Sequence, residues 1–329
     1  TFLEKNNDWY KSSVLIAKKL VQDITSVDAD FKIKQEGFQN LFYFRGDQEV
    51  MGNIEKLFKI ANTSPITVKN QVKFGNVNKW SPADIYLATN KAKGDIAQAV
   101  RKTKPKSYSF IDLNILTSNL IDSGDLLPLS LKKTTKDVQL QKVNFDKKSE
   151  IKALERVSLS SKKVTNWQLY KKVPFGTKGE TRDMRVFLNN NGEIKFRHDP
   201  SAKRFVAEFI GGGAEARGGS IGSIKLFCEL MSFVDKQTSK QILKEYQEGE
   251  KQYFIDLKLI ENLRAKDKKL FDHERGAISA MNIINRIMPI LKNWFMKTDK
   301  KKVDDFIRII FQYITSRTPL SGKFVIAKG

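Results

Sequence analysis

Apolar residues recur along this chain at spacings that predict both helices and strands. They repeat every three or four positions over 7–23 and again over 50–61, which predicts two amphipathic helices. A third helix is expected over 112–121, with Asp112 as its N-cap and Gly124 as the residue that ends it. The N-terminal part of the chain therefore supplies several helices to cover a sheet.

Strand patterns lie between and after these helices. The runs 84–87 and 126–132 are short and mainly apolar, which is typical of buried strands. Alternating residues over 183–188 and 193–197 flank an Asn/Gly turn and predict a β-hairpin. The segment 204–210 predicts a further strand.

The last third of the chain is helical in pattern. Residues 223 to about 317 form an almost continuous helical region, which we expect to be broken at Gly249, Gly276 and Pro289. Strands grouped before helices are typical of α+β proteins. We therefore predict an α+β fold with a mixed sheet, organised as an α/β core over 1–150, a β-hairpin and glycine-rich region over 151–222, and a helical domain over 223–329.

Net charge narrows the class of partner. The chain has 59 Lys and Arg against 37 Asp and Glu, a formal net charge of +22. Such an excess favours a polyanion, which means DNA, RNA or an anionic surface. The alternative is an ordinary solvated face, or a subunit packed against acidic neighbours. Candidates for phosphate contacts are Lys91, Lys93, Arg101, Lys102, Lys104, Lys106 and Lys133.

Cysteine, histidine and hydropathy exclude other classes. The single cysteine, Cys228, excludes an internal disulfide framework, and its apolar helical context predicts a buried, inert thiol. With two histidines in the chain, a protein-only zinc site is not expected. No apolar run is long enough to cross a membrane, and the first residues lack the apolar core of a signal peptide. We expect a cytoplasmic protein, or a component of a particle assembled in the cytoplasm, without a membrane partner.

Two charged residues on the predicted strands suggest chemistry at phosphate. Asp84 precedes the apolar residues of the first strand, and Lys132 ends the second. Phosphodiester cleavage needs charge neutralisation and an activated water, which a carboxylate-bound Mg²⁺ supplies. A lysine beside the ion stabilises the developing negative charge. Asp84 would then be the metal ligand, and Lys132 would orient the water.

The arrangement resembles the signature of the PD-(D/E)xK nuclease superfamily, in which a proline-aspartate element on one strand precedes an acid-x-lysine element on the next. The resemblance covers roughly residues 50–135. Ala83 separates Pro82 from Asp84, and Ser130 stands where the family has its second acid. The resemblance implies a nuclease-like core, a Mg²⁺ ion and DNA as substrate, and the lysine-rich chain is compatible with a phage-encoded protein.

The missing acid has several candidate replacements. Glu55, on the helix expected over 50–61, is the first choice as second metal ligand, with Glu49, Asp95 and Asp125 as alternatives. If none of them reaches Asp84, the core would bind nucleic acid without cutting it. Asp84 and the lysines after the second strand could also be ordinary residues at strand ends.

A glycine-rich segment, 211–222, lies between the last predicted strand and the helical region. Backbone N–H groups of Gly218 and Gly219, with the side chain of Arg217, are candidates for a phosphate clamp. P-loop spacing is present, but glycine replaces the required lysine, and a G-x-S-x-G match lies too far from its strand for a nucleophile elbow. A connector without a ligand is the alternative.

These observations predict a nucleic-acid-binding protein, with DNA as the expected partner and Mg²⁺-dependent endonuclease activity as the catalytic hypothesis. The alternative is a non-catalytic structural or assembly protein, such as a phage virion component, that contacts DNA or acidic partners. Either fits a homo-oligomer or a larger particle, in the host cytoplasm or the virion. Candidates for base stacking, with core packing as their alternative, are Trp80, Tyr108, Phe110 and Trp167.

Overall fold

The computed structural model combines helices and strands, which confirms the predicted α+β fold. It divides into two compact units: unit 1 is Thr1–Glu150 with Ser316–Gly329, and unit 2 is Ile151–Thr315. The predicted division into three consecutive segments does not coincide with these units, because the end of the chain returns to unit 1. The structure describes residues 5–25, 42–44, 47–66, 74–154, 157–165, 174–176, 184–189, 192–199, 204–211, 220–221 and 223–329.

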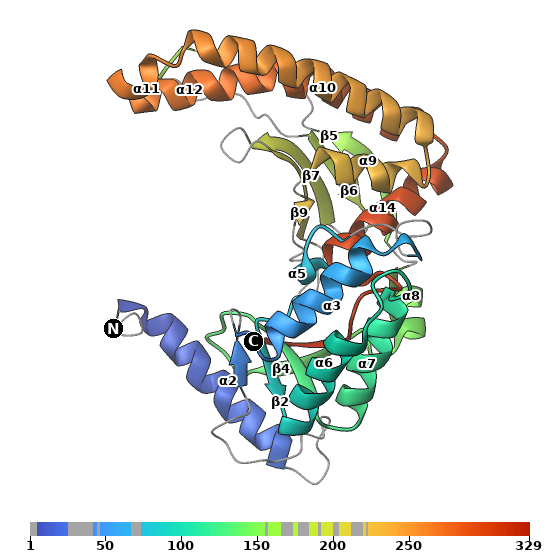
Figure 1. Cartoon of the computed structure of the whole chain (residues 1–329). Helices are drawn as coiled ribbons and strands as arrows, with labels where there is room; N and C mark the ends of the chain where they lie inside the picture. Colours follow the sequence, from blue (N-terminus) through green and yellow to red (C-terminus); the bar gives the residue numbers. More distant parts are fainter. Residues whose placement is uncertain are drawn as a thin grey trace. The chain divides into compact units, whose positions relative to one another are not determined.

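Unit 1 is built on a five-stranded mixed sheet (Figure 1). Strands β3 and β10 run parallel, and the other neighbouring pairs are antiparallel. The C-terminal strand therefore lies inside the sheet and not at its edge. The order across the sheet is β1 (Phe42–Phe44), β2 (Ile85–Ala88), β3 (Leu126–Leu131), β10 (Phe324–Lys328) and β4 (Gln139–Val143).

One face of this sheet is covered by α2 (Asn7–Thr25), which confirms the first predicted helix. Ile16 and Leu20 of α2 pack in one buried cluster with Leu129 of β3 and Val325 of β10. The helix therefore contacts both β3 and the C-terminal strand β10, and burial of these side chains is the main stabilising contribution of this layer.

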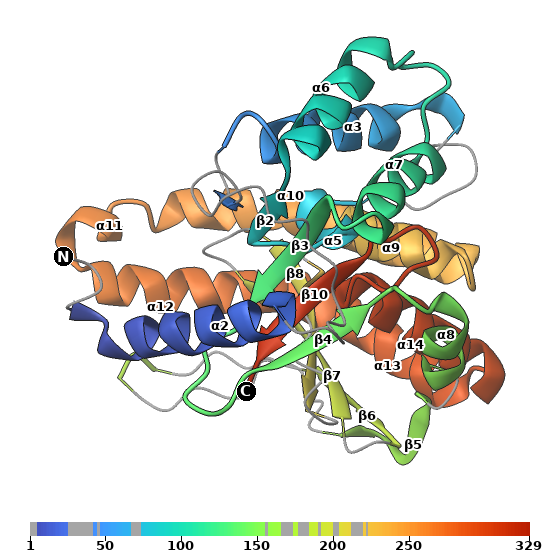
Figure 2. The same ribbon diagram turned by 90° about the horizontal axis from the view of Figure 1, so that it is seen from below.

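The opposite face is covered by α3 (Met51–Thr63), α6 (Asn90–Lys102) and α7 (Phe110–Asp122), as Figures 1 and 2 show. Phe58 of α3 contacts Phe110 and Trp80, with ring centroids 5.6 and 6.4 Å from its own; Trp80 ends the short helix α5 (Val77–Trp80). Both faces of the sheet are thus buried, which explains why β2 and β3 are mainly apolar instead of alternating, with Ser130 as the exception in β3.

The start of α7 differs from the prediction by three residues. The N-cap is Ser109, whose hydroxyl accepts from the N–H of Asp112, while the Asp112 carboxylate accepts from the N–H of Ser109. This reciprocal capping box places the acid at the third helical position, so the prediction of Asp112 as N-cap is wrong. The predicted stop is confirmed, because α7 ends at Asp122 and Gly124 has a φ of 74°.

Unit 1 also holds the segment that leads into β10. The Asn144 amide donates to the carbonyl oxygens of Ser316 and Gly322, both at 2.8 Å. The N–H of Gly322 donates to the carbonyl oxygen of Trp80 at 2.9 Å. Asn144 lies just before α8 (Lys147–Leu154), where the chain leaves unit 1. These bonds satisfy backbone groups outside any helix or strand, so the approach to β10 is fixed by unit 1 itself.

Unit 2 contains an antiparallel five-stranded sheet whose strands follow chain order: β5 (Leu159–Thr165), β6 (Met184–Leu188), β7 (Gly192–Asp199), β8 (Arg204–Gly211) and β9 (Ser220–Ile221). The predicted hairpin is confirmed by the β6–β7 pair, in which Val186 lies opposite Ile194, and the further predicted strand is β8. On one face, Phe196 and Phe205 pack against Phe227 of α9 (Ile224–Ser232), with centroids 5.7 and 5.1 Å apart.

The predicted helical region is confirmed, but its predicted breaks are wrong. Helix α10 runs through Gly249, α12 runs through Gly276, and Pro289 lies inside α13. A Cβ at Gly249 would overlap the carbonyl oxygen of Asn282, so glycine permits close contact between helix backbones here. Asn282 belongs to a π-helical turn, Ala280–Ile284. The helices are α10 (Lys236–Leu259), α11 (Leu263–Lys266), α12 (Lys268–Ser279), α13 (Asn285–Lys297) and α14 (Lys300–Ile314).

Asp235 caps α10 and joins it to two other helices. Its carboxylate accepts from the N–H of Thr238 at 3.0 Å, the indole N–H of Trp294 at 2.9 Å and the ammonium of Lys302 at 3.1 Å. Burial alone would raise the pKa of Asp235, but these hydrogen bonds outweigh burial and lower the pKa to about 2.

Replacing Asp235 by asparagine should destabilise the protein by about 1 kcal/mol near neutral pH, because the charge-assisted bonds are lost. The folded pKa lies below the unfolded value of about 3.9, so the carboxylate contributes above about pH 4 and its contribution is lost as the pH falls toward 2. Urea unfolding of wild type and Asp235→Asn, at neutral pH and near pH 2, measures this. A difference in unfolding free energy that does not shrink in acid would contradict the assignment.

Candidate functional site

The two charged residues of the nuclease-like signature lie on adjacent strands. β2 and β3 pair antiparallel with Ile85 opposite Leu129, which places Asp84 opposite Ser130. The N–H of Asp84 donates to the carbonyl oxygen of Leu129 at 2.7 Å. Its carboxylate accepts from the N–H of Leu131 at 2.8 Å and from the hydroxyl of Ser130 at 3.4 Å. Asp84 thus closes one end of the β2–β3 pair.

Lys132 follows the last residue of β3. Its N–H donates to the carbonyl oxygen of Ala327 in β10 at 2.9 Å, and its side chain is exposed. Both Lys132 and Asp84 are among the residues that the structure describes, and their side chains form no ion pair with each other. The backbone of Lys132 therefore extends the sheet, while its side chain faces solvent.

Asp84 and Lys132 together offer one carboxylate to a Mg²⁺ ion. Mg²⁺ prefers several hard oxygen ligands in near-octahedral geometry, and one carboxylate oxygen of Asp84 already accepts two hydrogen bonds inside the sheet. Glu55 is half-buried on α3. Over the part of the chain that the structure describes, no group of three or more His, Cys, Asp or Glu side chains could hold a metal ion. The Mg²⁺ ion and the metal-binding roles of Asp84 and Glu55 remain predictions.

Two of the alternative acids lie at the other end of the strand pair. The N–H of Thr89, which follows β2, donates to the carbonyl oxygen of Asp125, which precedes β3, at 3.0 Å. Five residues of extended chain separate Thr89 from Asp84, a distance of about 16 Å. Asp125, and Asp95 beside it, are therefore too far from Asp84 to share an ion with it.

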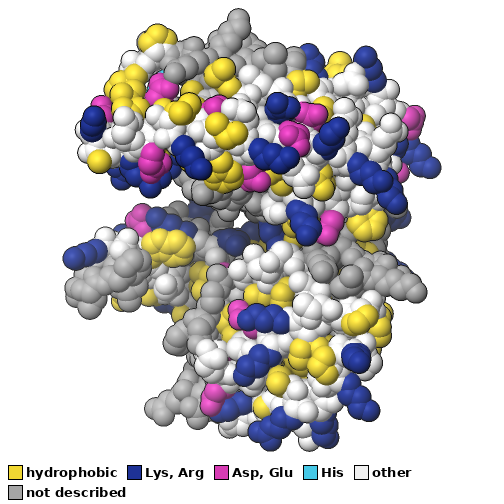
Figure 3. All heavy atoms as spheres, turned by 45° about the horizontal axis from the view of Figure 1, so that its top comes forward, with side chains coloured by type: hydrophobic (Ala, Val, Ile, Leu, Met, Phe, Trp, Pro, Cys, Tyr) yellow, Lys and Arg dark blue, Asp and Glu magenta, His cyan; other side chains and the backbone are white. Residues whose placement is uncertain are grey.

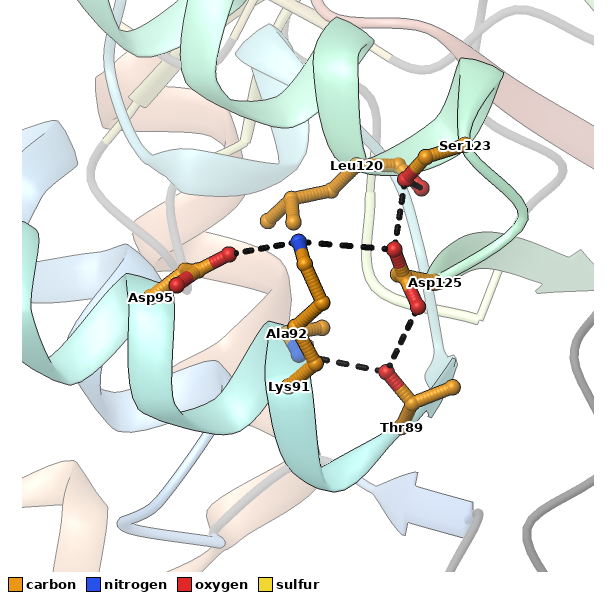
Figure 4. A network of polar contacts seen from close by, with 7 residues as sticks. All are labelled: Thr89, Lys91, Ala92, Asp95, Leu120, Ser123 and Asp125. Atoms are coloured by element: carbon orange, nitrogen blue, oxygen red, sulfur yellow. Dashed lines mark hydrogen bonds and ion pairs between the residues drawn. The ribbon is translucent and has the colours of Figure 1, made fainter.

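A polar network occupies this second end (Figure 4). The Asp125 side chain is 1% exposed, and it accepts from the hydroxyl of Thr89 at 3.1 Å and from the hydroxyl of Ser123 at 2.7 Å. The Lys91 ammonium lies 3.5 Å from Asp125 and 2.8 Å from Asp95. The hydrogen bond to Asp95 raises the pKa of Lys91, so the ammonium stays charged. The network ties the turn before α6 to the turn before β3.

Two surface cavities lie between α6 and α7. One has a volume of about 480 Å³ and is lined by Lys91, Asp95, Gln98, Ala99, Lys102, Leu116, Asn119, Leu120 and Ser123. The other has a volume of about 340 Å³ and is lined by Ala99, Lys102, Thr103, Lys104, Ser107, Tyr108 and Asp112. Lys102 lines both, so a basic side chain is shared by the two cavities.

Some of the predicted phosphate-binding residues are engaged by acids. Lys93 pairs with Glu49 at 2.6 Å, and Lys133 pairs with Asp8 at 3.1 Å. Lys91 is held by the network described above. These lysines contribute to the stability of unit 1, and an anionic ligand would have to compete with their carboxylates. Glu49 pairs with Lys93 in this structure, and its role as a metal ligand stays a prediction.

Four other cations lie together at the end of α6 and in the loop that follows it. Arg101, Lys102, Lys104 and Lys106 are exposed, and none of them forms an ion pair within the described ranges. From residue 90 to residue 107 the sequence contains one acid, Asp95, which is paired with Lys91. We call these four residues the α6 cation cluster.

The aromatic candidates for base stacking are mostly core residues. Trp80 and Phe110 are buried, and the Trp80 indole donates to Asn114 at 3.0 Å, which confirms core packing for both. Tyr108 is half-buried at the 340 Å³ cavity, and burial raises its pKa. The Tyr108 hydroxyl has no hydrogen-bond partner among the residues described. Trp167 lies outside the described ranges.

The proposed phosphate clamp of Arg217, Gly218 and Gly219 also lies outside the residues that the structure describes.

Cys228 is buried, and burial raises the pKa of its thiol to about 12, which confirms an inert cysteine. Nowhere in the described ranges is a helix both long and apolar enough to cross a membrane.

Thr89 and Ser123 were missed by the sequence reasoning. A threonine just before a helix is an N-cap signal, and the Thr89 hydroxyl does accept from the N–H of Ala92. No nearby sequence signal places Ser123 and Asp125 beside Thr89, because their proximity depends on the pairing of β2 with β3.

Comparison of the chain with protein-family models, curated proteins and solved structures found no match. The function must therefore be argued from the geometry.

Removal of the buried carboxylate tests the network. We expect Asp125→Ala to destabilise the protein by about 3 kcal/mol, because the hydroxyls of Thr89 and Ser123 lose their acceptor. The exposed Asp95→Ala is the control and should cost less than about 0.5 kcal/mol. Urea unfolding monitored by circular dichroism measures both. Equal, small effects would show that the network does not hold the two turns together.

Proposed function

We propose that unit 1 binds nucleic acid, with DNA as the partner, through phosphate contacts made by the α6 cation cluster. The observation that carries the proposal is that four exposed cations gather at one end of α6 without acid partners in the described structure. Lysines at the start of the same helix do have acid partners, so the lack of partners is particular to this end.

Interaction with the dipole of α6 explains the presence of only two of the four cations in the α6 cation cluster. Cations in the last turn of a helix interact favourably with its dipole, which suits Arg101 and Lys102. Lys104 and Lys106 lie beyond the last turn, where this effect has faded. Like charges this close repel one another, and a phosphate backbone relieves that repulsion while it releases counterions.

The surroundings of the cluster also suit a phosphate backbone. The 340 Å³ cavity is lined by Lys102 and Lys104, and both lysines are exposed. Ammonium groups are common donors to phosphate. The net charge of +22 adds long-range attraction to a polyanion. Contacts of this kind position a duplex but do not read its sequence, so we propose binding without base preference.

Cleavage is not part of this proposal. Asp84 is engaged in the β2–β3 pair, and the acids at the opposite end of that pair are about 16 Å from it. The endonuclease hypothesis therefore remains a prediction, which the plasmid-cleavage assay below tests.

A structural or assembly protein is the second candidate, and one observation favours it. Ile255 and Leu259 of α10 are 57% and 76% exposed, and apolar side chains exposed together often belong to protein interfaces. In such a protein the basic surface would contact packaged DNA or acidic partners, and the chain would associate into a homo-oligomer or a larger particle. Light scattering over a range of concentrations separates this candidate from a monomeric DNA-binding protein.

Neutralising the cluster should weaken DNA binding. In a variant with Arg101, Lys102, Lys104 and Lys106 all replaced by glutamine, the slope of log affinity against log salt should become shallower by about 0.9 for each phosphate that is no longer neutralised, or by about 3 to 4 in total. Fluorescence anisotropy with a labelled duplex at several salt concentrations measures affinity and slope together.

A charge-matched variant controls for net charge. Replacing Lys11, Lys18, Lys56 and Lys59, exposed lysines of α2 and α3, by glutamine removes the same total charge from unit 1. An equal fall in affinity for both variants would contradict a localised site.

Cleavage is tested by incubating plasmid DNA with the protein and Mg²⁺. Plasmid cleavage that disappears in Asp84→Ala or Lys132→Ala would replace the binding proposal with the catalytic one.

A further inference from the structure

The outward face of α10 carries a row of seven exposed residues, five of which are lysines. Positions 236, 240, 244, 247, 251, 254 and 258 follow the three- and four-residue spacing that places side chains on one face of a helix. All seven are exposed, and those other than lysine are Gln247 and Phe254. The lysines, which we call the α10 lysine row, are Lys236, Lys240, Lys244, Lys251 and Lys258.

The row lies opposite the packed face of the helix. The buried residues of α10 repeat at the same spacing on the other side: Ser239, Ile242, Tyr246, Gly249 and Tyr253. Figure 3 brings the α10 end of unit 2 forward and shows Lys and Arg side chains across the exposed surface there. The lysines therefore take no part in the core, and packing does not explain their regular spacing.

The acids of α10 are placed off this row. Glu245 pairs with Arg286 of α13 at 2.9 Å. Glu248 pairs with Lys251 from the side of the row at 2.8 Å. Charge on α10 is thus segregated, with basic residues along one line and acids beside or behind it, whereas a merely solvated helix commonly alternates the two signs.

The N-terminal half of the row has one acid near it, Glu248, whose pKa is lowered mainly by its hydrogen bond with Lys251 and also by the charge of Lys244. Lys236, Lys240 and Lys244 are spaced four residues apart, and none of them forms an ion pair within the described structure. Like charges at this spacing destabilise a helix. A bound polyanion would remove that repulsion, so these three lysines are the best place to look for a ligand.

We infer that the α10 lysine row is a second phosphate-binding surface, through which unit 2 contacts the backbone of double-stranded nucleic acid. The inference rests on the proposed function, since it adds a surface for the same partner. From Lys236 to Lys258 the row is about 33 Å long at 1.5 Å per residue. One turn of a DNA duplex is about 34 Å long. A row of this length spans about one turn of a duplex, which is itself stiff over that distance.

An anionic membrane fits the row less well. A helix that lies in a membrane interface buries a broad apolar face. The outward row contains one apolar residue among its seven positions, Phe254, and the exposed Ile255 and Leu259 lie to one side near its C-terminal end. The half that carries Lys236, Lys240 and Lys244 has only polar neighbours on the row.

Full-length protein in which these three lysines are replaced by glutamine provides the test, with a labelled duplex about three helical turns long as the probe. Its affinity at low salt should fall about tenfold or more, and its salt slope should become shallower by about 2 to 3. The matched control replaces Lys266, Lys268 and Lys269, exposed lysines of α11 and α12, and should change affinity less than about twofold. Equal melting temperatures for wild type and both variants establish that folding is unchanged.

The outcomes separate this inference from the proposed function. If wild-type protein does not bind the duplex, both fail. If the α6 cluster variant loses affinity while the α10 variant binds as wild type does, the inference alone is overturned. It is also overturned if the α10 variant loses binding to a single strand but not to the duplex, or to phosphatidylserine vesicles but not to the duplex.

Discussion

The pairing of β10 with both β3 and β4 is the constraint on which the arrangement of the chain depends. Val325 lies opposite Leu129 on one side and Lys142 on the other, so the last strand fills the interior of a sheet begun far earlier in the sequence. A parallel pair requires a crossover, and here the crossover is the whole of unit 2. Unit 2 is thus an insertion in unit 1, which can complete its core only when both ends of its own chain are present.

The same sheet determines what unit 1 can do. Antiparallel pairing of β2 with β3 places Asp84 at one end of the pair and the Asp125 network at the other, so the acids of the nuclease-like signature and their candidate replacements are kept apart. The network fixes the start of α6, and the helix then carries the α6 cation cluster away from the acids at its beginning. This arrangement is the reason why we propose phosphate binding and not metal-assisted cleavage for unit 1.

Elements whose pattern is local could be predicted from the sequence, whereas those that depend on distant partners could not. Helix α2 and the β6–β7 hairpin are each specified within a short segment. The end of the chain is predicted as helical, because nothing near β10 indicates that its partners are β3 and β4. In the sequence, Gly249 is expected to break a helix. The reason for glycine at this position is the close approach of the Asn282 carbonyl, which belongs to a distant helical turn and is not evident from the local sequence. For the site, the basic residues are evident in the sequence, but the acids that neutralise some of them, such as Glu49 and Asp8, are known only from the fold.

Joining Glu150 to Ser316 through a short glycine-serine linker, with Ile151–Thr315 removed, tests the dependence of unit 1 on β10 most directly. The two ends are held near each other, because Asn144 bonds to Ser316 and the Arg317 guanidinium lies 3.8 Å from Glu150. We expect the joined protein to unfold in one cooperative thermal transition and to protect the amides of Val325 and Ala327 from hydrogen exchange. A joined protein that lacks such a transition, or one that folds while the β10 amides exchange as fast as those of a free peptide, would contradict this view of the fold.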